Sequence, residues 1–340
     1  MSQTLKENRL IGVDLMGGDN APESNIEACL AAAQDGFHLA AFGTEEAVDA
    51  LESRAGGLSI ITVVCSEVVV PDEPPLQAIR RKPDSSIRRG ITAVKEGAVD
   101  AFVSAGSTGA LVAGGALILG RAGGVDKPCL AQVLPDRLQR GVLFLDLGAS
   151  TDSRPQTLVQ FAVMGSAYAE GVLGRENPKV FLLNNGTEPE KGNAVTKKAF
   201  ELLKSAPVNF MGNIEARDVF SGIADVIVSD GFSGNVFLKT CEGTSEFLMS
   251  VLREEITRGL MQKAASLILK PAFSRVRALL DYSNYGGAPL LGLRGCVVKC
   301  HGSSGHIAVA NGIRQAHRYI VGKVSDVIER TLAALNLEGE

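Results

Sequence analysis

The chain has 340 residues, a formal net charge of -4 and a hydrophobic content of 45%, which indicates a globular protein of one large or two ordinary domains. The acidic balance, the absence of tryptophan and the presence of only four tyrosines argue against general binding of nucleic acid. Thirty-eight glycines beside thirteen prolines indicate many tight turns between regular elements rather than a disordered chain.

The first apolar segment, Leu10 to Leu15, predicts a strand. Its loop, Met16-Gly17-Gly18-Asp19, leads to a helix that ends at Gly36. Short strands follow at residues 39–42 and 59–64. This order of strand, loop and helix is typical of an α/β protein.

Five cations occur within ten residues after these strands. Such a run is usually a solvated face, but in an acidic chain it also suits docking of an acidic partner, and both interpretations stay open. The five are Arg80, Arg81, Lys82, Arg88 and Arg89.

A second loop rich in glycine and hydroxyl residues follows the short strand predicted at Asp100 to Val103. The loop runs from Ser104 through Gly106, Ser107 and Thr108 to Gly109, and a helix of small residues then ends near residue 120. Residues 101–120 carry no charge, but their glycines and hydroxyl side chains favour strand, loop and helix over a membrane span.

Later apolar segments predict further strands, and each ends in glycine and small polar residues. The strands are expected at residues 141–147, 180–183, 208–211, 226–228 and 297–299. The polar residues after them include Ser150, Asn184 to Asn193, Gly212 to Glu215, Asp230 to Asn235, and His301 to Gly305. Helices are expected at residues 155–171, 236–252 and 307–320.

Seven strand ends therefore carry glycine with small polar side chains. In a parallel α/β sheet such loops lie at the carboxyl edge, where they can converge on one crevice. Unpaired backbone N–H groups and a helix N-terminus at such a junction favour an oxyanion. A single loop of this kind is often only a tight connection, but the repetition predicts a shared oxyanion-binding site.

Other chemistries lack support in the sequence. GxGxxG and GxxxxGK[ST] are absent, so no nucleotide cofactor is implied, and no complete GxSxG nucleophile elbow occurs. The six cysteines lack CxxC spacing and predict buried reduced thiols in a cytosolic protein. Cys296, Cys300 and His301 cluster, but without the usual zinc spacings, so no metal is expected. The polar N-terminus, Met1 to Arg9, argues against secretion.

Residues 256–280 form a basic amphipathic stretch, broken at Pro271, with apolar residues between cations and no acid. Two interpretations stay open. The segment is either a helical hairpin that buries its apolar face in a dimer, or a surface that rests on an anionic membrane.

Collected together, these loops resemble the phosphate acyltransferase family of bacterial phospholipid synthesis, PlsX, over nearly the whole chain. The motifs that carry the resemblance are Asp14-Leu-Met-Gly-Gly-Asp19, Arg80-Arg-Lys-Pro-Asp-Ser-Ser86, Ser104-Ala-Gly-Ser-Thr-Gly-Ala110, Glu190-Lys-Gly-Asn193, Gly212-Asn-Ile-Glu215, Asp230-Gly-Phe-Ser-Gly-Asn-Val236, Gly286-Gly-Ala-Pro-Leu-Leu-Gly292 and His301-Gly-Ser-Ser304. The family usually has Asn where Ser107 and Ser150 stand, and an Ile-Gly-Glu-like sequence where Asn185-Gly186-Thr187 stands.

The resemblance implies a three-layer α/β/α fold with a mostly parallel sheet, similar to isocitrate and isopropylmalate dehydrogenases. We expect one domain over residues 1–340, with a helical excursion at residues 240–285. The implied reaction moves a fatty acyl group from acyl carrier protein to inorganic phosphate without a cofactor. The implied setting is a cytosolic homodimer with a contact to the membrane and a downstream membrane glycerol-3-phosphate acyltransferase.

The resemblance also assigns roles to residues. Phosphate needs cationic donors, and Lys191 and His301 are expected to act as catalytic residues, with Asp230 orienting Lys191 or the loop backbone. The arginines and lysine from Arg80 to Arg89 are expected to dock the acidic carrier. Phosphate or oxyanion donors are expected among Ser104, Gly106, Ser107, Thr108, Gly109, Asn213, Ser233, Gly234, Asn235, Gly302, Ser303 and Ser304, beside the loop of Asp14, Gly17, Gly18 and Asp19.

Two other functions are open at this stage. One is a short-chain or branched acyl-CoA phosphotransferase of similar fold. The other is a catalytically weak scaffold that binds acyl carrier protein at the membrane.

Overall fold

A computed structural model describes residues 9–259, 268–273, 275–276 and 286–335. Seven strands form one sheet in the order β3-β2-β1-β4-β12-β11-β5. They are β1 (Leu10–Asp14), β2 (His38–Gly43), β3 (Ile60–Val64), β4 (Ala101–Ser104), β12 (Cys296–Lys299), β11 (Ala288–Leu291) and β5 (Cys129–Leu130). The first five run parallel, and β11 pairs antiparallel with both β12 and β5.

A second sheet has five strands in the order β6-β7-β10-β8-β9. They are β6 (Gln132–Leu134), β7 (Val142–Leu145), β10 (Val226–Val228), β8 (Lys179–Asn184) and β9 (Asn209–Glu215). Only β6 is antiparallel to its neighbour. A single residue, Ala131, separates β5 from β6, so one short stretch of chain links the two sheets.

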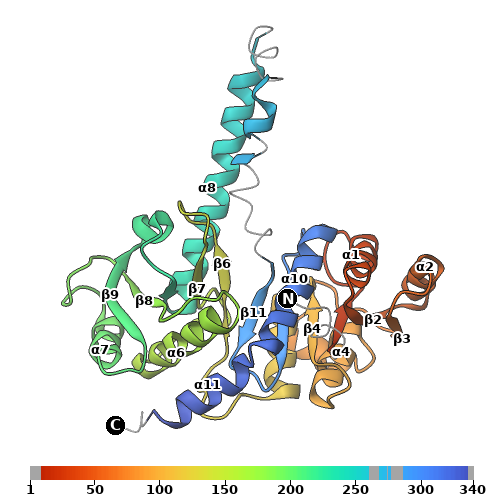
Figure 1. Cartoon of the computed structure of the whole chain (residues 1–340), viewed down its shortest axis with the longest axis horizontal. Helices are drawn as coiled ribbons and strands as arrows, with labels where there is room; N and C mark the ends of the chain where they lie inside the picture. The colour runs from red at the N-terminus through yellow and green to blue at the C-terminus, as the bar shows by residue number, and fades with distance from the viewer. Residues whose placement is uncertain (1–8, 260–267, 274, 277–285, 336–340) are drawn as a thin grey trace.

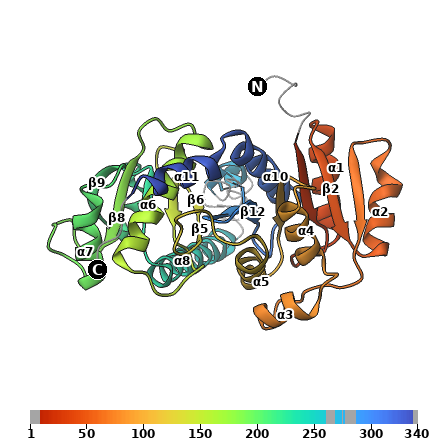
Figure 2. The ribbon, with the colours of Figure 1, turned by 90° about the horizontal axis from the view of Figure 1, so that it is seen from below.

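Helices cover both faces of these mostly parallel sheets, which confirms the predicted fold class (Figures 1 and 2). They are α1 (Glu23–Gln34), α2 (Glu45–Ala55), α3 (Pro75–Arg81), α4 (Ser86–Lys95), α5 (Thr108–Gly114) continued by the π-helical turn η2 (Gly115–Leu119), α6 (Pro155–Gly171), α7 (Ala194–Leu203), the 3-10 helix η3 (Ala216–Ser221), α8 (Gly231–Thr257), α10 (His306–Val321) and α11 (Val324–Ala333). Strand β4, helix α5 and η2 confirm the strand, loop and helix expected over residues 101–120.

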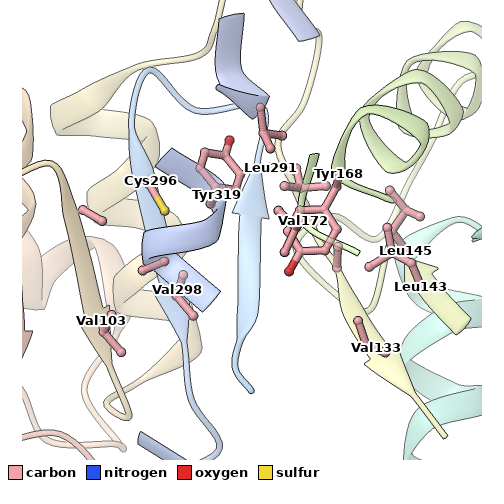
Figure 3. Packing of buried hydrophobic residues seen from close by; sticks show 14 of the residues in the cluster. Val103, Val133, Leu143, Leu145, Tyr168, Val172, Leu291, Cys296, Val298 and Tyr319 are labelled. Carbon is pink, nitrogen blue, oxygen red and sulfur yellow. The ribbon is translucent and has the colours of Figure 1, made fainter. Parts of the chain in front are cut away.

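The core runs without interruption from one sheet to the other. Figure 3 shows Tyr168 of α6 and Tyr319 of α10 between the strands of the two sheets, and their ring centroids lie 6.3 Å apart. Leu291 and Leu145, from opposite sheets, are fully buried in the same cluster. All six cysteines are free, and five of them are buried, as expected. The shared apolar core therefore joins the two sheets and fixes the position of the loops at their edges.

At two of the boundaries that differ from the sequence predictions, a glycine-containing loop belongs to a regular element. Helix α8 begins at Gly231 rather than near Val236, because Asp230 caps it and accepts the N–H of Ser233 at 2.8 Å. Strand β9 continues to Glu215, and Asn213 pairs with Leu182 of β8 after a register shift. Gly212 has φ +115°, a conformation that glycine adopts without strain.

Helix α8 projects far beyond the body of the molecule as an arm (Figure 1). Its 27 residues correspond to a length of about 40 Å. Its buried residues are Gly231, Gly234 and Leu238, all in the first turns, whereas Phe247 and Leu248 are 65% and 53% exposed. Within the described ranges, no helix is long and apolar enough to cross a membrane. Much of the predicted amphipathic segment, including Leu267, lies outside the described residues.

Candidate functional site

A cavity of about 500 Å³ lies where the loops after β4, β7 and β12 meet the first turns of α8. Four of the seven strand ends singled out in the sequence, those of β4, β7, β10 and β12, therefore contribute to one site. The lining residues are Pro75, Thr108, Gly109, Val112, Ala113, Ala116, Leu130, Gln132, Leu147, Gly148, Ala149, Asn235, Leu238, Lys239, Glu242, Gly286, Gly287, Ala288, Lys299 and His301.

The loop after β4 is shaped by a buried pair. Ser104 donates its hydroxyl to Asp14 of β1 at 2.6 Å and accepts the N–H of Gly106 at 2.9 Å. Burial raises the pKa of Asp14. Ser107 then caps α5 by accepting the N–H of Ala110 at 3.4 Å. Ser104 and Asp14 thus stabilise the loop from the buried side, while Thr108 and Gly109 line the cavity.

The start of α8 packs tightly on the loop after β7. A Cβ atom built on Gly231 would lie 1.9 Å from the carbonyl oxygen of Ser150, and one on Gly234 would lie 2.0 Å from that of Asp146. Asp146 in turn accepts backbone N–H groups of its own loop, including Ala149 at 3.0 Å. This contact directs Asn235, the next residue of the helix, into the cavity.

The loop after β12 carries His301. The Nδ1 atom of His301 lies 2.8 Å from the Ser303 hydroxyl and accepts the Ser303 N–H at 3.2 Å. Accepting this N–H favours an unprotonated Nδ1 and leaves the proton of the neutral ring on Nε2. Burial, followed by the positive charge of Lys299, lowers the pKa of His301. At neutral pH His301 is therefore an uncharged hydrogen-bond donor.

The loop after β1 supports this β12 loop without lining the cavity. The N–H of Asp19 donates to the carbonyl of Gly302 at 2.8 Å, and the Asn20 amide donates to the carbonyl of Ser303 at 3.2 Å. Asp19 and its neighbours Gly17 and Gly18 thus lie behind the site rather than in it.

The structure adds a residue that the sequence reasoning missed. Lys299 ends β12, is only 9% exposed and lines the cavity. Burial lowers its pKa. A second missed cation, Lys239 of α8, also lines the cavity and pairs with Glu242 at 2.6 Å. The available signal was a lysine at the end of the otherwise apolar strand Cys296–Lys299, directly before Cys300, since a buried lysine needs a special reason.

The lining of the cavity mixes two kinds of residue. Apolar side chains include Val112, Ala113 and Leu147. Polar and cationic groups include Lys299 and His301, which belong to the same strand end. Such a site suits an anion or oxyanion attached to, or reacting with, an apolar chain.

Lys191 lies apart from this cavity. It is exposed, and its carbonyl accepts the Asn184 amide at 3.2 Å in the loop between β8 and α7. Buried Asn213 donates to the carbonyl of Glu188 at 2.8 Å and so shapes this loop. Lys191 and Asn213 are therefore near each other but outside the residues that line the cavity.

Of the expected phosphate donors, Thr108, Gly109 and Asn235 line the cavity together with His301. The N–H groups of Ser233 and Gly234 already donate to Asp230, to its carboxylate and its carbonyl respectively. The expected residues outside the lining are Ser104, Gly106, Ser107, Asn213, Asp230, Ser233, Gly234, Gly302, Ser303 and Ser304, besides Lys191.

The predicted docking cations flank the site, because Pro75, at the start of α3, lines the cavity and α3 ends at Arg81. Three of the five already have partners. Lys82 pairs with Glu73, Arg89 with Asp84, and Arg88 donates to the carbonyl of Ile79. The exposed side chains of Arg80 and Arg81 form no ion pair with any described residue.

Comparison with known proteins gives a consistent result. A family model described as "Fatty acid synthesis protein" matches residues 10–327. The phosphate acyltransferase of Brevibacillus brevis is 46% identical over 324 residues, covering 95% of this chain and 97% of the relative. The phosphate acyltransferase of Geobacillus sp. is 44% identical over 324 residues, covering 95% and 98%.

Solved structures are similar in fold. A phosphotransacetylase from Streptococcus pyogenes superimposes with a TM-score of 0.61 at 18% identity, covering 96% of this chain and 97% of that one. A branched-chain phosphotransacylase from Enterococcus faecalis gives a TM-score of 0.54 at 15% identity, covering 91% and 98%. At these identities the likeness shows the fold alone.

Proposed function

We propose, because the chain belongs to the phosphate acyltransferase family, that it transfers a fatty acyl group from acyl carrier protein to inorganic phosphate and so forms acyl phosphate for phospholipid synthesis. The observation that carries the proposal is one cavity lined both by apolar side chains and by Lys299, His301 and Asn235. The apolar residues suit an acyl chain, and the polar and cationic residues suit phosphate.

A phosphate oxygen attacks the thioester carbonyl, a tetrahedral oxyanion forms, and the carrier thiol leaves as thiolate. A thiol has a pKa of about 8.5, so the thiolate leaves readily and the enzyme mainly has to position phosphate and stabilise the oxyanion. A covalent acyl-enzyme is not required. The buried thiols do not favour one either, because burial raises the pKa of Cys300 to about 12.

We assign the neutral His301 ring and the Asn235 amide as hydrogen-bond donors to phosphate or the oxyanion, with Thr108 and Gly109 on the loop after β4, the strand next to β12. The catalytic role that the sequence predicts for Lys191 is kept as a separate proposal, because Lys191 lies in the loop after β8 outside the cavity lining, and substitution tests it. Asp230 is assigned as a positioning residue, since its contacts cap α8 beside Asn235.

We assign carrier docking to Arg80 and Arg81. Their side chains are exposed, lie on the helix whose start borders the cavity, and are the two of the five cations without a described partner. Acyl carrier protein is strongly acidic in this family, and rim charges act mainly on association rate and its salt dependence. Their place therefore suits delivery of the carrier's acyl chain to the cavity.

We assign the arm, together with the basic amphipathic stretch at residues 256–280, to dimer formation and to a contact with anionic membrane. Ile268 is 82% exposed, and Phe247 and Leu248 are exposed on α8, so the arm presents apolar surface beside cations such as Arg258 and Lys270. Vesicle flotation is expected to show salt-sensitive binding that is lost when Leu267, Ile268 and Leu269 become Gln or Ser. If wild type never floats, the arm serves the dimer alone.

One assay tests the proposal against its alternatives. Purified protein, phosphate and a C16 thioester of either acyl carrier protein or coenzyme A are mixed, and acyl phosphate is trapped as hydroxamate. The expected result is phosphate-dependent product with a higher kcat/KM for the carrier thioester. A preference for short or branched acyl-CoA would identify a phosphotransferase of that class, and carrier binding without product would identify a scaffold.

A further inference from the structure

Lys299 is a buried lysine in the cavity lining, and neither the Asp19 nor the Glu242 carboxylate forms an ion pair with it. Its Nζ donates to the carbonyl of Cys300, and it forms no ion pair with any residue in the described part of the chain. An ammonium has three N–H groups, so two remain for other acceptors. Burying a charge without a partner is costly, so buried charges in proteins are as a rule paired or coordinated.

The neighbours of Lys299 support this conclusion. Lys239 adds positive charge and is itself paired with Glu242, while Cys300 is held as a neutral thiol by burial. The Asp19 carboxylate interacts electrostatically with Lys299. Asp19 lies next to Gly302 and is not among the residues that line the cavity. The local charge inside the cavity is therefore positive and suits an anion.

We propose that the Lys299 ammonium is a phosphate-binding residue of this site, holding inorganic phosphate beside His301 for attack on the thioester. This inference rests on the proposed function. The backbone of Lys299 is held in place by the sheet, since β12 pairs in register with β4 and places Lys299 opposite Ser104. Its burial excludes water around the ion pair, which strengthens the interaction with phosphate.

Lys299 also gives the site a defined pH response. Its lowered pKa means that the ammonium loses its proton below the ordinary value of 10.5, so phosphate affinity falls as pH rises through that lowered pKa. Lys239, Asp19 and Cys300 affect the pKa of Lys299, and Lys299 affects that of His301. Glu242 faces the same cavity.

The test measures phosphate binding by calorimetry and the KM for phosphate in wild type, Lys299→Met and Lys198→Met. Lys198 is an exposed lysine of α7 and serves as the matched control for the loss of one charge. Lys299→Met is expected to raise both Kd and KM for phosphate roughly 10- to 100-fold, as for a lost hydrogen bond to a charged group, whereas Lys198→Met stays within about twofold of wild type. Unchanged phosphate binding in a folded Lys299→Met protein, or no phosphate binding by wild type, would overturn the proposal.

A second measurement uses wild type alone, in case Lys299→Met does not fold. Trinitrobenzenesulfonate modifies neutral amines, and the extent at each lysine is read by peptide mass spectrometry at about pH 8. Phosphate is expected to protect Lys299 and not Lys198, and equal modification of Lys299 with and without saturating phosphate contradicts the assignment. Loss of phosphate binding in Lys299→Met with no acyl phosphate from wild type would support Lys299 but refute the proposed function. Acyl phosphate formation by wild type, with an unchanged KM for phosphate in Lys299→Met, would support the proposed function but refute the role of Lys299.

Discussion

Gly234→Ala tests whether the contact between α8 and the loop after β7 sets the geometry of the site. The added Cβ would lie 2.0 Å from the Asp146 carbonyl oxygen and 2.7 Å from the Ser229 hydroxyl. The first neighbour is backbone, so no side-chain rotation relieves the clash and the start of α8 has to move. Asn235 moves with it, because it is the next residue of the helix.

The magnitude follows from two opposing effects. Overpacking typically costs 1–3 kcal/mol and more when backbone must shift, while Ala in place of Gly in a helix favours folding by about 0.5–1 kcal/mol. We expect a net loss of about 2 kcal/mol. Gly243→Ala on the same helix has no neighbour within 4 Å and is expected to gain up to about 1 kcal/mol. An unfolding entropy of about 2.1 cal/mol/K per residue converts these values to a Tm about 3 °C lower and about 1 °C higher.

The assay compares thermal unfolding and acyl phosphate formation in both variants. Gly234→Ala is expected to lower kcat/KM tenfold or more, since a small misplacement of a catalytic donor has a large effect on rate. Gly243→Ala is expected to keep wild-type turnover. If Gly234→Ala matches Gly243→Ala in both Tm and kcat/KM, the tight contact does not exist in the folded protein and the account of this side of the site is wrong.

Further predictions concern charge. His301→Ala and Lys191→Ala are each expected to lower kcat by roughly 10²- to 10³-fold with the fold intact. If either variant keeps most of its phosphate-dependent turnover, the catalytic role of that residue is wrong. Arg80 and Arg81 changed together to Glu are expected to weaken turnover of the carrier thioester more than that of a small thioester at low salt, and equal losses would show misfolding or direct catalysis instead. The pKa of His301, measured by NMR titration, is expected below 6.5. It is expected to rise in Lys299→Met, because the positive charge of Lys299 is one cause of the lowered pKa. An unchanged pKa in this variant would show that the two side chains do not interact.

Local signals were sufficient to predict much of the fold. The continuous apolar run Val226 to Val228 is a strand, and the helix expected at residues 155–171 has those bounds. Both segments carry their information locally, in strand periodicity and in Pro155 at the first helical turn. The short strands β5, β6 and β11 were missed because they are defined by pairing with distant segments rather than by their own pattern.

The residues of the site could be predicted only in part from local sequence patterns. Glycine loops at the ends of β4 and β12 predicted Thr108 and His301, and both line the cavity. Loop composition alone does not distinguish residues that face a cavity from those that support it, as Ser104 shows by bonding to Asp14. Loop composition could not indicate Lys299, because this lysine is the last residue of a strand and its burial is set by tertiary packing.

The proposed mechanism transfers the acyl group from thioester to phosphate in one step. A single-turnover experiment with stoichiometric acyl carrier protein thioester tests this step, with carrier thiol, acyl phosphate and intact protein mass measured at each time. We expect that thiol release requires phosphate, that one acyl phosphate forms for each thiol, and that the protein mass does not change. Thiol release without phosphate, accompanied by an acyl adduct on the protein such as one at Ser303, which lies 2.8 Å from His301 Nδ1, would contradict it.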